Sequence, residues 1–159
     1  MLGIINIVFF SPEDLNIIKS GPAERRRFMD MELCQLDKIY VHNLVNYNKA
    51  LLQRNKLLKD ISFAPSLADT LDVWDEQLVR YGKELIRIRR EFVNNLNSII
   101  FDIHGRLSGN KEQLELVYEP SVDEEEFKNR LYLSREKDIR QKTTVYGPHR
   151  DDLSFMLGD

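Results

Sequence analysis

The chain contains two long stretches, residues 22–61 and 67–106, in which apolar side chains recur at every third or fourth position. The second stretch repeats a large apolar residue every seven positions, at Leu71, Leu78, Leu85, Phe92 and Ile99. This spacing places the side chains on one face of a helix and is typical of helices that pair along a seam. Only a short turn, residues 62–66, separates the two stretches, so the sequence predicts an antiparallel helical hairpin.

Both helices of the hairpin are expected to be continuous. The apolar stripe of the first helix consists of Met29, Leu33, Leu36, Tyr40, Leu44, Tyr47, Leu51 and Leu58. In the second helix Trp74, Tyr81 and Ile88 follow the heptad leucines by three residues and extend the seam. Because the heptads are imperfect, we expect the helices to splay at one end and to bury their second faces. Those second faces consist of Ile39, Val45, Leu52, Ile86, Val93 and Ile100.

The beginning of the chain predicts two shorter elements. Residues 4–10 are β-branched and aromatic, which is typical of a strand buried on both faces. Ser11 and Pro12 then form an N-cap and a proline at the first helical position, so a short helix should begin here and end before Gly21.

The second half of the chain predicts a third helix and further strands. Residues 114–119 alternate as a strand does, and Ser121 with Glu124 forms a capping-box pattern for a helix over residues 123–142. Short strands are expected at 143–146 and 153–157. The predicted fold class is α+β, mainly α: a long antiparallel, coiled-coil-like helical hairpin with a third helix and a few short strands at its base.

Composition limits the function classes. With 23 Lys and Arg against 26 Asp and Glu, the net charge is −3, so any contact with nucleic acid must be local. The single cysteine, Cys34, excludes a disulfide framework and a multi-cysteine metal site, and we interpret it as a structural thiol. The apolar start is too short to span a bilayer, so we expect a cytoplasmic protein without a membrane partner.

Two groups of basic residues are candidates for contact with DNA phosphates. Arg25, Arg26 and Arg27 begin the first long helix, where the macrodipole disfavours cations and an anionic partner is therefore expected. Glu24, Asp30 or Glu32 could be that partner instead of a phosphate. Arg80, Lys83, Arg87 and Arg90 recur at three or four residues and share one face of the second helix. A solvated helix flank is the alternative interpretation of this face.

The motif His149-Arg150-Asp151-Asp152 near the end of the chain has several interpretations. It is similar to the catalytic loop of protein kinases, but the glycine-rich loop, strand lysine and downstream Asn of a kinase do not accompany it. Its adjacent side chains would point to opposite faces of an extended segment, which argues against convergence on one metal ion. A locally satisfied polar turn is the simplest interpretation, and we assign no metal site and no catalytic residue.

Three segments together resemble the RecF family, bacterial DNA-repair ATPases of the ABC/SMC type. They are 9–15, 21–30 and 146–153, and they occur in the same order in that family. The resemblance implies an internal piece covering the second lobe, with the P-loop before Met1 and the ABC signature and Walker B segments beyond Asp159. It also implies a division into residues 1–20 as a flanking part of the ATPase head, 21–145 as a helical lobe and 146–159 as a return segment.

The resemblance has functional implications for the full-length parent and for individual residues. The parent would bind ATP and Mg²⁺, form an ATP-dependent dimer, engage DNA at gaps or junctions, and help load RecA with RecR and RecO. His149, Arg150, Asp152 and Glu13 become candidates for a nucleotide interface. The chain itself should bind no cofactor and lack ATPase activity, because phosphoryl transfer needs the P-loop and a Walker B acid. The alternative is a non-enzymatic helical hairpin that serves as a protein-interaction module.

Overall fold

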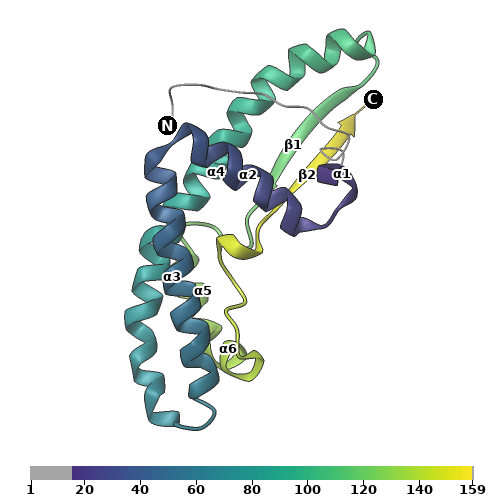
Figure 1. Ribbon diagram of the computed structural model, residues 1–159. Helices are drawn as coiled ribbons and strands as arrows, with labels where there is room; N and C mark the ends of the chain where they lie inside the picture. Colours follow the sequence, from purple (N-terminus) through teal and green to yellow (C-terminus); the bar gives the residue numbers. More distant parts are fainter. Residues whose placement is uncertain (1–15, 159) are drawn as a thin grey trace. The chain divides into compact units, whose positions relative to one another are not determined.

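The computed structural model describes residues 16–158 (Figure 1). The predicted strand at 4–10 and the candidates Ser11 and Glu13 lie outside the described residues. The elements are α1 (Asn16–Lys19), α2 (Pro22–Leu36), α3 (Lys38–Asp60), the 3₁₀ helix η2 (Pro65–Thr70), α4 (Leu71–Ser108), β1 (Gln113–Glu119), α5 (Phe127–Leu133), α6 (Arg135–Gln141), the 3₁₀ helix η3 (Pro148–Arg150) and β2 (Asp152–Gly158). The predicted class, mainly α with few strands, is confirmed.

The described chain forms two compact units, each assembled from segments far apart in sequence. The first unit contains residues 16–38, 88–119 and 151–158, and the second contains 39–87 and 120–150. Helix α4 contributes its first part to the second unit and the remainder to the first. The division into residues 1–20 as a part of the ATPase head, 21–145 as a helical lobe and 146–159 as a return segment stays a prediction.

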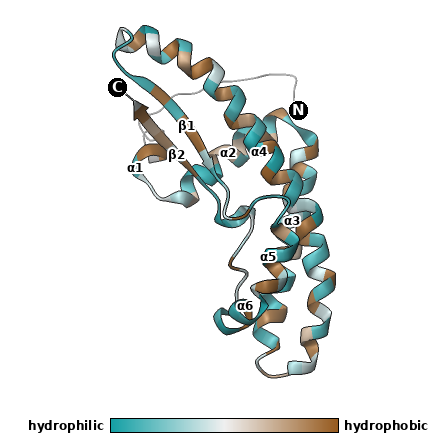
Figure 2. Ribbon diagram, turned by 180° about the vertical axis from the view of Figure 1, so that it is seen from behind, coloured by the Kyte–Doolittle hydropathy of each residue, from teal (hydrophilic) through white to brown (hydrophobic). Residues whose placement is uncertain are grey.

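The second unit contains the predicted helical hairpin. Leu58 and Ile61 near the end of α3 pack with Leu71 at the start of α4, and Arg54 pairs with Asp75 one turn further along. This order of contacts is antiparallel, and the ribbons of α3 and α4 run side by side in both views (Figures 1 and 2). Brown and teal alternate along both helices in Figure 2, the pattern of helices with one apolar face.

The seam of the hairpin on α4 consists of the heptad leucines and a second series of partner positions. The second series differs from the prediction. The heptad leucines Leu71, Leu78 and Leu85 are buried, as predicted. The partner positions lie four residues after them, not three, and are occupied by Asp75, Gly82 and Arg89. Trp74 and Tyr81 of the predicted series are only half-buried, although Ile88 is buried. The close packing at Gly82 explains part of this difference, because a Cβ at that position would lie 2.5 Å from the ring of Phe127.

The first long helix is interrupted, contrary to the prediction. Asp37 takes an extended backbone (φ −135°, ψ 114°) between α2 and α3, while its N–H still donates to the carbonyl of Leu33. The stretch contains no internal Gly or Pro to signal this break. Leu36 of the predicted stripe lies next to the interruption and is exposed.

The predicted burial of the second helix faces holds only for α4. Ile86 and Val93 are buried, and Ile100 packs against the core of the first unit. The prediction is wrong for Ile39, Val45 and Leu52, which are exposed on α3. Within the second unit, α3 buries the seam positions instead, so its far side is left to solvent.

The first unit is organised around a two-stranded antiparallel sheet. β1 pairs with β2 in a register that places Leu116 opposite Phe155 and Tyr118 opposite Leu153, confirming the strands predicted at 114–119 and 153–157. Met29 of α2 and Val93 of α4 complete a core with Leu116 and Leu153. Cys34 on α2 is half-buried, and burial raises the pKa of its thiol, as expected of a structural cysteine.

The predicted third helix and one predicted strand are wrong in detail. The helix begins at Phe127, not at residue 123, and divides at Ser134 into α5 and α6. Ser121 does not act as a cap, because its hydroxyl donates to the carbonyl of Gly147 and accepts the Gly147 N–H, both at 2.9 Å. Residues 143–146 form no strand, since side chains bind the backbone of Thr144 and Val145 instead.

Within the described part of the chain, every helix is too short or too polar to cross a membrane.

Candidate functional site

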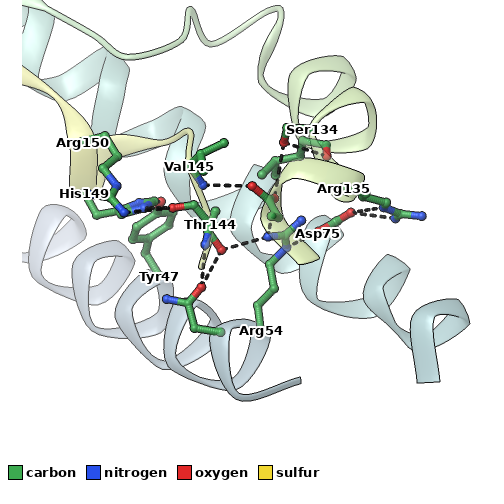
Figure 3. A network of polar contacts seen from close by, with 12 residues as sticks. Tyr47, Arg54, Asp75, Ser134, Arg135, Thr144, Val145, His149 and Arg150 are labelled. Carbon is green, nitrogen blue, oxygen red and sulfur yellow. Dashed lines mark hydrogen bonds and ion pairs between the residues drawn. The ribbon is translucent and has the colours of Figure 1, made fainter. Parts of the chain in front are cut away.

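A buried arginine on α3 holds the segment that leads into the His149 motif (Figure 3). The Arg54 guanidinium donates to Asp75 of α4 at 2.6 Å, to Asp138 of α6 at 2.7 Å and to the hydroxyl of Thr144 at 2.9 Å. Its side chain is fully buried, as is that of Asp138. A buried charge needs such partners, so this network joins α3 to three further segments of the second unit.

Further charges surround the Arg54 network. Arg135 of α6 donates two hydrogen bonds to Asp75, at 2.9 and 2.6 Å, and also pairs with Asp72. Asp138 accepts the Val145 N–H at 3.1 Å, and burial raises the pKa of this carboxyl although Arg54 opposes the shift. One nitrogen of Arg54, Nη2, is buried without a hydrogen-bond partner among the described residues.

His149 is held by two groups of the second unit. Its Nδ1 lies 2.7 Å from the hydroxyl of Tyr47, and its Nε2 lies 3.0 Å from the carbonyl of Thr144. Thr144 is itself fixed by Asn55, which accepts from both its N–H and its hydroxyl at 2.8 Å. Both ring nitrogens of His149 therefore have internal partners, which fits a positioning role within the loop.

The start of α2 holds the other end of the same motif, within the first unit. Arg25 donates to both carboxylate oxygens of Asp152, at 2.7 and 2.8 Å, and Arg26 donates to the backbone carbonyl of Asp151 at 2.6 Å. The bidentate pair with Arg25 holds the pKa of Asp152 below its ordinary value. The main anionic partner of this arginine group is thus Asp152, while Glu24, one of the predicted partners, lies 3.9 Å from Arg27.

Asp151 is the centre of a second buried network. Arg89 of α4 donates to Asp151 at 3.0 Å and to Asp30 of α2 at 2.8 Å. Tyr118 of β1 donates its hydroxyl hydrogen to the same carboxylate, and burial followed by the Asp151 charge raises the pKa of this phenol well above its ordinary range. Arginines of two helices, α2 and α4, and a tyrosine of β1 therefore fix the residue that directly precedes β2.

The described residues form no metal centre of their own. No group of three or more His, Cys, Asp and Glu side chains among residues 16–158 is arranged to hold a metal ion. The polar side-chain atoms of His149 and Asp152 form hydrogen bonds with internal partners. Arg150 is exposed, and its guanidinium lies 3.5 Å from the Thr144 carbonyl oxygen. The geometry fits a structural anchor, and a nucleotide-interface role for these residues stays a prediction.

The basic candidates fall into half-buried and exposed sets. Arg25 and Arg26 have internal acceptors, whereas Arg27 is exposed and lies 3.9 Å from Glu24. On α4, Arg87 pairs with Glu84 at 2.9 Å, and Arg80 lies over the Tyr81 ring at 5.6 Å from its centroid. Lys83 and Arg90 are half-buried. Their contact with DNA stays a prediction, and Glu84 partly neutralises the face.

Sequence reasoning missed the two buried arginines, Arg54 and Arg89. A signal was available, because Arg54 continues the three-and-four spacing of Tyr47 and Leu58, and Arg89 follows Leu85 by four residues. A cation at a seam position must have buried acidic partners. Those partners lie up to 84 residues away along the chain and carry no local pattern.

Comparison with known proteins gives a consistent result. The chain is 62% identical over 99% of its length to the DNA replication and repair protein RecF of Agathobacter rectalis, of which it covers 43%. It is 62% identical over its whole length to RecF of Lachnospira eligens, covering 44% of that protein, and 42% identical to RecF of Clostridium perfringens. No family model matches.

Solved structures agree with these relatives. The fold matches a structure of the recombination mediator protein RecF-ATPrS in the RecFOR pathway with a TM-score of 0.91 and 36% identity, over 98% of this chain and 44% of that one. The RecF-ATP structure gives the same values. The mainly helical lobe described above therefore matches part of a DNA replication and repair protein. The chain belongs to the RecF family, and it spans less than half the length of the relatives it matches.

Proposed function

We propose that the full-length parent binds ATP and Mg²⁺, dimerises on ATP and engages DNA at gaps or single-strand/double-strand junctions in the cytoplasm. With RecR and RecO it then helps to load RecA in repair and replication. The observation that carries this proposal is the match to the RecF structures over 98% of the chain. Because the match covers 44% of those structures, ATP chemistry is assigned to the rest of the parent.

The role of this chain within that function is to position the return segment that leads toward the ABC signature. Support comes from the way the segment is anchored: Thr144 and His149 are bound in the second unit, and Asp151 and Asp152 in the first. We infer that the chain by itself does not hydrolyse ATP, because phosphoryl transfer needs a P-loop and the sequence contains no P-loop motif.

The test compares the full-length parent with this chain for ATP-dependent binding to gapped duplex DNA. The parent should bind more tightly with ATP than without nucleotide, and the chain should show no nucleotide dependence. Calorimetry provides the direct check that the chain does not bind ATP at micromolar affinity. Equal DNA affinity of the parent with and without ATP would contradict the proposal.

A further inference from the structure

The outer side of α3 carries a row of lysines with aliphatic residues between them. Val45, Lys49, Leu52, Lys56 and Lys59 recur at intervals of four, three, four and three residues. At about 100° per residue these positions fall within about 80° of one another around the helix. All five side chains are exposed, with Leu52 at 69%. We call these five residues the α3 lysine face.

Residues 16–158 provide no internal carboxylate that pairs with the lysines of this face. Arg54 lies about 180° around the helix from Val45, and it is the cation that the buried network employs. Among the described residues, Lys49, Lys56 and Lys59 form no ion pair with a carboxylate. The acid that α3 contains is Asp60, its last residue. The helix macrodipole favours Lys59 in the last turn but does not explain Lys49, almost three turns earlier.

The two basic faces differ in their acidic neighbours. On α4, Glu84 pairs with Arg87, and Arg80 lines a groove of about 550 Å³ together with Asp72, Asp75 and Glu76. An anionic polymer would meet these carboxylates there. Beside the α3 lysine face, a smaller groove of about 220 Å³ contains Lys56, Gln53, Leu57, Trp74 and the carboxylate of Asp60. The positive charge is therefore more continuous on α3.

Resting on the proposed function, we propose that the α3 lysine face binds the phosphate backbone of DNA. Lys49 and Lys59 are ten positions apart, which is about 15 Å along the helix. Phosphates of one strand of a duplex rise by about 3.4 Å each, so the face spans about four of them. Flexible lysines suit such a row, because they act as point charges that adapt to phosphate positions without reading sequence.

The test replaces Lys49, Lys56 and Lys59 together with Gln, which keeps a long side chain of similar helix propensity. The matched control replaces Lys111, Lys128 and Lys137 with Gln as well. These three lysines are exposed and lie outside α3, so the control removes the same charge. Fluorescence anisotropy of gapped duplex DNA with this chain is measured from 50 to 200 mM salt, with helicity followed by circular dichroism. Three contacts predict an about 40-fold loss of wild-type affinity across that range.

The α3 variant should bind at least about tenfold more weakly at 50 mM salt, with a salt slope reduced by about two to three units, while the control keeps both values. A folded α3 variant with unchanged affinity and slope overturns the inference, as does a wild-type chain that binds no DNA. Neither result depends on the ATP-dependent binding of the parent to gapped duplex DNA, which is the separate test of the proposed function. A glutamate-rich peptide that competes as strongly as DNA would instead make the face a docking site for an acidic protein.

Discussion

Arg89 and Asp151 lie 62 residues apart in sequence, and the Arg89 guanidinium donates to the Asp151 carboxylate at 3.0 Å with both side chains almost completely buried. Replacing Asp151 with Asn keeps the shape and removes the charge. The free energy of unfolding should fall by about 3 kcal/mol, because the buried charge of Arg89 is then no longer balanced by the carboxylate of Asp151. Urea denaturation measures this free energy. Asp102→Asn, an exposed change of the same kind on α4, is the control, and an equal effect of both substitutions would contradict the burial of this pair.

Leu85 is fully buried at the seam of the hairpin. Leu85→Ala should lower the free energy of unfolding by about 2–4 kcal/mol, through lost transfer energy and the cavity left behind. Val73→Ala on the same helix, where the side chain is 57% exposed, should change it by less than about 0.5 kcal/mol. Chemical denaturation of both variants gives the comparison, and a Leu85→Ala effect as small as that of Val73→Ala would place the seam on another face.

Arg25 makes folding sensitive to acid through Asp152. The pKa of Asp152 is lower in the folded protein than in the unfolded chain, so the unfolded chain binds more protons in the acid range. The stabilisation is therefore present above the unfolded value of about 4 and is lost as the pH falls toward the folded pKa. Asp152→Asn should remove this contribution, so the stability gap between wild type and variant narrows below about pH 4.

Denaturation midpoints between pH 6 and pH 2.5 would measure that gap. Asp69→Asn, on the exposed 3₁₀ helix η2, provides the control for a simple loss of charge. A gap for Asp152→Asn that stays constant through the acid range would mean that the Arg25 pair does not form in solution.

Gly147 should tolerate no side chain. Its φ of +131° lies where L-residues are strained, and a Cβ there would collide with the hydroxyl of Tyr47 and come within 3.0 Å of the Phe127 ring. Gly147→Ala should therefore lower the thermal midpoint by several degrees. Gly21→Ala is the matched substitution, because its φ is −76° and no other atom lies within 4 Å of the added Cβ. Similar midpoints for the two variants would refute the close packing of this loop.

The sequence was sufficient to predict the hairpin, because two long periodic stretches with a short turn allow few other arrangements. It was also sufficient for the two strands, whose apolar residues alternate. The break at Asp37 was missed because no Gly or Pro marks it in the sequence. The capping role assigned to Ser121 failed for a related reason: its hydroxyl finds partners on Gly147, 26 residues later, which local sequence does not reveal.

The candidate site was predicted unevenly. His149 and Asp152 were identified through the family resemblance, and the structure shows what holds each of them in place. Arg54 and Arg89 were missed because a charged residue is ordinarily assigned to the surface when its partners are unknown. The exposure of Leu52 was missed for the opposite reason, since an apolar residue on a periodic helix was assumed to be covered.

The buried arginine of α3 has a consequence for the order in which the chain folds. Asp75 is 21 residues from Arg54 and can pair with it as soon as the hairpin closes, but Asp138 and Thr144 are 84 and 90 residues away. During synthesis the guanidinium must stay hydrated until those later residues have emerged, because dehydration with one acid alone is costly. The burial of the Arg54 guanidinium among its partners should therefore be a late step in folding. Substitutions at Thr144 should then accelerate unfolding more than they slow folding.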